Sequence, residues 1–93
     1  MRENIEDYRR RMWDEYLIEI TDDYRYKGFI LYGGSYKARI PEIRDGKPFV
    51  GRGFEPTYII HAQYAQDLQT KINKWLRDHP EEKKILRAWR DLI

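Results

Sequence analysis

Apolar residues recur at helical spacing in separate parts of this chain. Within residues 3–20, the residues spaced three and four apart are Ile5, Tyr8, Met12, Trp13, Tyr16, Leu17 and Ile20. Within residues 64–78, the same spacing joins Ala65, Leu68, Ile72, Trp75 and Leu76. A last stripe, in about residues 80–92, comprises Ile85, Leu86, Trp89, Leu92 and Ile93. Since residues at these spacings share one face of a helix, each stretch is predicted to form an amphipathic helix.

The segment from Asp78 to Glu82 has the composition of a helix start. Asp78 offers a capping side chain, Pro80 suits a first helical turn, and two acidic residues follow it. Acidic side chains are favourable near the positive end of the helix dipole. We therefore expect the last helix to begin at this segment, directly after the preceding helix.

Residues 24–40 are predicted to form a β-hairpin closed by Gly33-Gly34. A two-residue hairpin loop needs positive φ, which glycine adopts without steric cost. Counting outward from this loop, Leu31 opposes Tyr36 and so shares a face with it. The residues expected on the core face are Phe29, Leu31, Tyr36, Ala38 and Ile40. Those expected on the outer face are Tyr24, Tyr26, Ile30, Tyr32, Lys37 and Arg39.

A third strand is expected after this hairpin. Pro41 should end the second strand, because proline cannot donate a ladder hydrogen bond. Asp45-Gly46 predicts the next turn, and a strand is expected from Phe49 to about residue 54. Residues 57–62 are compatible with a strand or with the start of a helix, although their β-branched and aromatic content favours a strand.

These elements predict one α+β domain over residues 1–93. It has a three-stranded antiparallel sheet with an N-terminal helix and two C-terminal helices packed mainly on one face, in the order α-β-β-β-α-α. Three strands give a face about 15 Å wide, which accepts one or two helices of about 10 Å diameter. The C-terminal helix therefore packs on the other helices, or it buries Trp89, Leu92 and Ile93 against a partner or a second copy of the chain.

Charge is distributed unevenly along the sequence. The net charge is +2, but residues 1–23 hold four Arg against eight acidic residues, whereas residues 24–56 hold seven basic against three acidic residues. The predicted sheet is thus basic and the first helix acidic. This asymmetry either serves an anionic partner or allows the first helix to lie beside the sheet.

The sequence offers little support for catalysis, a metal or a cofactor. It contains no cysteine, and its one serine, Ser35, has no evident base nearby. His79 is expected in a helix-capping region and His61 half-buried at an element edge. Residues 51–56 have Pro56 where a dinucleotide-binding loop needs its third glycine. We therefore expect no enzyme, no cofactor and no catalytic or metal-binding residues.

The expected role is that of a small binding or regulatory protein that acts through protein contacts. No apolar run reaches membrane length, and charge begins at Arg2, so we expect a cytoplasmic protein without a secretory signal. A protein partner or a homodimer is the expected assembly. The contact residues predicted on the outer sheet face are Tyr24, Tyr26, Tyr32, Lys37 and Arg39. The alternative is that this same face binds nucleic acid, with tyrosines stacking on bases and cations contacting phosphates.

Overall fold

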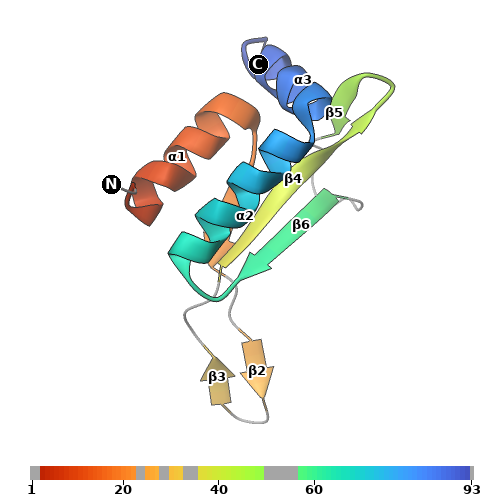
Figure 1. The fold of residues 1–93 in the computed structure, drawn as a ribbon. Coiled ribbons are helices and arrows are strands. Elements are labelled where there is room, and N and C mark those ends of the chain that lie inside the picture. The colour runs from red at the N-terminus through yellow and green to blue at the C-terminus, as the bar shows by residue number, and fades with distance from the viewer. Residues whose placement is uncertain (1–2, 23–24, 28–29, 33–35, 50–56, 93) are drawn as a thin grey trace.

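The fold is α+β, with one helix before the strands and two helices after them (Figure 1). The computed structural model describes residues 3–22, 25–27, 30–32, 36–49 and 57–92. In chain order the elements are α1 (Ile5–Tyr16), β1 (Glu19–Asp22), β2 (Arg25–Lys27), β3 (Ile30–Tyr32), β4 (Tyr36–Arg44), β5 (Lys47–Phe49), β6 (Thr57–Ala62), α2 (Ala65–Asp78) and α3 (Pro80–Arg90). The predicted fold class is therefore confirmed, with more strands than expected.

The main sheet has four strands rather than the predicted three, and β4 is its central strand. The first half of β4 is flanked by antiparallel β1 and β6, and its last residues pair with β5. Ala38 pairs with Ile20 of β1 and with Ile60 of β6. These three side chains are at most 9% exposed, so this row carries the sheet face that packs against the helices.

The predicted hairpin register is wrong. Leu31 pairs with Tyr26 rather than with Tyr36, because β2 and β3 form a separate two-stranded sheet. Tyr36 instead pairs with Asp22 of β1 and with Ala62 of β6. Pairing β4 with β1 buries Ile20 in the core, and this apolar burial explains why β1 is the neighbour. Phe29 and the predicted Gly33-Gly34 loop lie outside the described residues.

The first helix ends four residues earlier than the apolar pattern predicted. Asn4 caps its start, where its Oδ1 accepts a hydrogen bond of 2.9 Å from the Asp7 amide. At the other end, Leu17 adopts the left-handed conformation with φ 60°, which stops the helix after Tyr16. Ile18 is fully buried beyond this stop, and the chain continues into β1.

The predictions for the remaining strands have mixed outcomes. Pro41 does not end its strand; β4 continues to Arg44, because Pro41 is its last residue paired with β6 and the pairing with β5 begins at the next residue. The Asp45-Gly46 turn is confirmed, with both residues at positive φ. Residues 57–62 form a strand, as their composition favoured. The expected strand beyond Phe49 falls on residues 50–54, outside the described part.

Both C-terminal helices form, and a single residue separates them. His79 occupies the position between them, whereas the predicted cap Asp78 belongs to the last turn of α2. Pro80 is at the start of α3, as expected. Leu86 anchors α3 in the core with 0% exposure, so this helix packs within its own domain. None of the described helices is both long and apolar enough to cross a bilayer.

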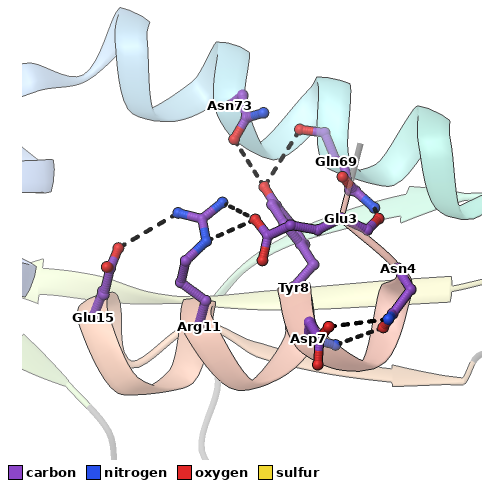
Figure 2. A network of polar contacts seen from close by, with 8 residues as sticks. All are labelled: Glu3, Asn4, Asp7, Tyr8, Arg11, Glu15, Gln69 and Asn73. Carbon is purple, nitrogen blue, oxygen red and sulfur yellow. Dashed lines mark hydrogen bonds and ion pairs between the residues drawn. The ribbon is translucent and has the colours of Figure 1, made fainter. Parts of the chain in front are cut away.

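Polar contacts hold α1 against α2 (Figure 2). Tyr8 is 1% exposed, and its hydroxyl donates a hydrogen bond of 2.8 Å to Asn73 Oδ1. Gln69, also buried, donates from Nε2 to the Glu3 carbonyl oxygen at 3.0 Å. Arg11 donates from Nε to Glu3 Oε1 at 2.8 Å, so the segment before α1 is tied to both helices. Tyr8, the first buried residue of α1, thus fixes this end of the helix against α2.

Candidate binding pocket

The structure separates the residues of the predicted outer sheet face. Lys37 and Arg39 alternate with buried Ala38 and Ile40 on β4, so they lie on the face opposite the core. Arg39 forms an ion pair with Glu19 of β1 at 3.8 Å. Their neighbours in register are residues of β1 and β6 rather than the expected tyrosines.

Two of the three tyrosines predicted on that face belong to a different sheet from Lys37 and Arg39. Tyr26 and Tyr32 belong to the separate β2–β3 sheet, and their side chains are outside the described part of the chain. Tyr24 also lies outside the described residues. A role for these positions in protein or nucleic-acid binding stays a prediction.

At the end of α3, the predicted contact residues have different surroundings. Trp89 is half-buried, and Lys47 Nζ of β5 lies 5.7 Å from its ring centre. Leu92 follows the helix and is 74% exposed, while Ile93 lies outside the described residues. Trp89 is thus partly engaged within its own chain, and its role in partner or dimer contact stays a prediction.

A pocket of about 350 Å³ lies where β4, β6, α2 and α3 meet. Its lining combines aromatic rings, carboxylates and two apolar residues. The lining residues are Pro41, Glu42, Ile43, Tyr58, Trp75, His79 and Glu82. None of them was predicted as a contact residue, because they come from four elements that are separated in sequence.

Trp75 and His79 form the rigid wall of this pocket. They are four residues apart, so they lie on one face at the end of α2. Their rings stack with centres 4.3 Å apart and an angle of 15° between planes. His79 Nδ1 is 2.8 Å from the Trp75 carbonyl oxygen, and because a carbonyl only accepts, Nδ1 carries the proton and donates. The ring orientation of His79 is therefore fixed by the stack and by this hydrogen bond.

Tyr58 extends the aromatic wall from the sheet. It pairs with Ile40, so it lies on the helix side of the sheet near the start of β6. Its ring centre is 5.8 Å from that of Trp75, with a 36° tilt. Tyr58 is nevertheless 54% exposed, and this accessible surface is available for burial against a ligand.

Two glutamates add negative charge to the pocket. Glu42 accepts a hydrogen bond of 2.9 Å from Arg44 Nε, so its charge is partly balanced. Glu82 lies in the first turn of α3 and makes no ion pair with a described residue. A cation beside these carboxylates would also gain from the electron-rich faces of the Trp75 and Tyr58 rings.

Aromatic rings beside two carboxylates are features that suit an organic cation. Among the described residues, no group of three or more metal-ligating side chains is arranged to hold an ion. His61, the other histidine, is exposed rather than half-buried as expected, and it lies on β6 outside this lining. The spacing of Trp75 and His79, with Pro80 directly after them, was the local signal that sequence reasoning passed over.

Comparisons with protein-family models, with curated proteins and with solved structures gave no match.

Proposed function

We propose that this chain is a small non-catalytic binding protein that acts through protein contacts. The pocket around Trp75 receives a lysine or arginine side chain of a partner protein. The observation that carries this proposal is the aromatic wall of Tyr58, Trp75 and His79 beside the carboxylate of Glu82, which forms no ion pair with a described residue.

The size and exposure of the site support a side-chain ligand. A pocket of about 350 Å³ is near the lower end of the range for small-molecule sites, so it suits one side chain and its flanking backbone. Tyrosine and tryptophan are enriched among the residues that dominate binding energy at protein interfaces. Tyr58 is exposed while Trp75 packs against the core, which gives a pre-positioned anchor with accessible surface.

The lining also supports binding rather than catalysis. Its described lining residues include no serine, threonine, cysteine or lysine, all of which can act as covalent nucleophiles. His79 is held by Trp75 through stacking and a hydrogen bond, and Glu42 is held by Arg44. Positioned rings and one available carboxylate are features of recognition.

A peptide titration tests the proposal. A short peptide with one central arginine is added to the ¹⁵N-labelled chain, and its citrulline analogue, neutral but nearly identical in shape, is the ligand control. We expect the arginine peptide to shift the Trp75 indole N–H signal and the Glu82 amide signal. Tyr58→Ala removes a cation–π contact, and Glu82→Gln removes an ion pair. Each substitution should weaken binding roughly threefold to tenfold.

The chain offers matched control variants for both substitutions. Tyr64 is a tyrosine outside the pocket that is 62% exposed, and Glu81 precedes Glu82 in the same helical turn without lining the pocket. Tyr64→Ala and Glu81→Gln should leave the affinity unchanged. Equal binding of the citrulline peptide, or equal losses in the control variants, would show that the pocket does not select a cation.

A further inference from the structure

A second depression lies on the helical layer, away from the pocket around Trp75. This groove, of about 470 Å³, lies between α1, α2 and α3. Two of its lining residues are the cations Arg77 and Lys83, on either side of the α2–α3 junction. Both side chains are exposed, and neither forms an ion pair with a described residue. The groove therefore presents two positive charges that no described residue of the chain neutralises by an ion pair.

Arg11, a third cation in this groove, is already engaged. Its Nη2 lies 2.6 Å from Glu3 Oε1, and its Nη1 lies 3.5 Å from Glu15 Oε2 (Figure 2). These two carboxylates balance its charge and hold it along α1. The net charge available to a ligand thus comes from Arg77 and Lys83.

Two neutral hydrogen-bonding groups line the same groove. Tyr16 is only 5% exposed, yet its hydroxyl makes no hydrogen bond with a described residue. Because Tyr16 lines the groove, its hydroxyl can donate a hydrogen bond to a ligand there. Asn73 accepts the Tyr8 hydroxyl at Oδ1, which turns its amide nitrogen away from Tyr8, as Figure 2 shows. That amide keeps N–H donors for a second partner.

We propose that this groove binds a phosphomonoester dianion. Two cations that form no ion pair with a described residue match its two negative charges, and the three terminal oxygens accept from more donors than the two oxygens of a carboxylate do. Arg77 and Lys83 contact the phosphate, and Tyr16 and Asn73 donate to its remaining oxygens. Met12 and Leu76, which also line the groove, pack against the organic part of the ligand.

The test uses phenyl phosphate as the probe and phenyl sulfate as its control, because the sulfate ester has similar shape but one negative charge. Binding is measured by calorimetry at neutral pH and low salt with the full chain. Since charge-assisted hydrogen bonds to a dianion are the stronger ones, we expect phenyl phosphate to bind at least about tenfold tighter. A short phosphotyrosine peptide, added in a parallel titration, shows whether a protein or a free metabolite is the better source of this group.

Matched variants place the binding in the groove. The double variant Arg77→Gln/Lys83→Gln should weaken phenyl phosphate binding about tenfold or more. Lys84→Gln/Arg87→Gln removes the same charge from exposed positions of α3 that do not line the groove, and it should change affinity less than about twofold. Tyr16→Phe should weaken binding about threefold to tenfold through loss of one hydrogen bond. Equal effects of both double variants, or equal binding of the two esters, would overturn the proposal.

Discussion

The hydroxyl of Tyr8 and the side-chain oxygen of Asn73 are 2.8 Å apart, joining the first helix to the second across most of the sequence. Tyr8 is almost fully buried, and this burial raises the pKa of its hydroxyl to about 12 from the usual 10. The hydroxyl therefore stays protonated at neutral pH and acts as a donor to Asn73.

This raised pKa predicts a loss of stability at alkaline pH. The folded state favours protonated Tyr8. The contribution of this protonated side chain to the unfolding free energy is fully present below pH 10 and is lost as pH rises toward 12. A shift of two pKa units corresponds to about 2 to 3 kcal/mol of unfolding free energy. Urea denaturation at several pH values above 8 measures it. Tyr8→Phe, which costs about 1 kcal/mol at neutral pH, should flatten the decline relative to the unmodified chain. An equally steep decline in both proteins would contradict this cause.

Replacing His79 tests the junction between α2 and α3. His79→Ala removes the stack on Trp75 and the hydrogen bond to the Trp75 carbonyl, so we expect a loss of about 1 to 2 kcal/mol in unfolding free energy. His79→Phe keeps a ring without the donor and should lose less. Thermal unfolding measures both variants. Unchanged melting temperatures in both would show that the stack does not hold the two helices.

Removing the Leu86 side chain tests whether α3 belongs to the domain core. Leu86 is fully buried, so Leu86→Ala should cost about 2 to 5 kcal/mol of unfolding free energy. Leu92 is 74% exposed, and Leu92→Ala should change the stability by less than about 0.5 kcal/mol. Sedimentation of the same variants reports on self-association. A dimer that dissociates on Leu92→Ala would assign the end of α3 to an interface between copies.

Substituting Gly46, in the turn between β4 and β5, should change the stability through backbone conformation alone. Gly46 has φ +75°, and an added Cβ would meet no atom within 4 Å. Gly46→Ala should therefore destabilise by about 1 to 2 kcal/mol through backbone strain alone. Gly46→Asn should cost less, because asparagine tolerates this conformation better. Urea midpoints of the two variants compare the effects, and a larger loss for asparagine would contradict the explanation.

The helices were predictable from sequence because their signals are local. The apolar spacing that includes Leu68 and Ile72 fits a helix and not a strand, and Pro80 marks the start of α3. The strands were harder to predict. Ile20 fits the helical spacing of α1 and also the alternation of β1, so local pattern did not separate the two. The left-handed turn at Leu17 decides the matter, and leucine gives no signal for it.

Strand pairing and the candidate pocket depend on contacts between distant segments. Two adjacent glycines suggested a hairpin onto Tyr36, but that position of β4 pairs with β1 and β6 instead. The pocket needs Tyr58 and Trp75 to meet from different elements, and no sequence period reports such a meeting. Only the four-residue spacing of Trp75 and His79 was visible beforehand.

The contacts of Tyr8 have a consequence for how the chain folds during synthesis. Its partners Gln69 and Asn73 lie more than sixty residues downstream, so the apolar stripe of α1 has no helical surface to cover it while the nascent chain is still short. Contacts of such sequence separation form slowly, because the chain entropy is lost before they stabilise the fold. A ribosome-bound intermediate that ends before α2 would therefore expose Tyr8 and Met12, which makes it a natural substrate for chaperones that bind apolar segments.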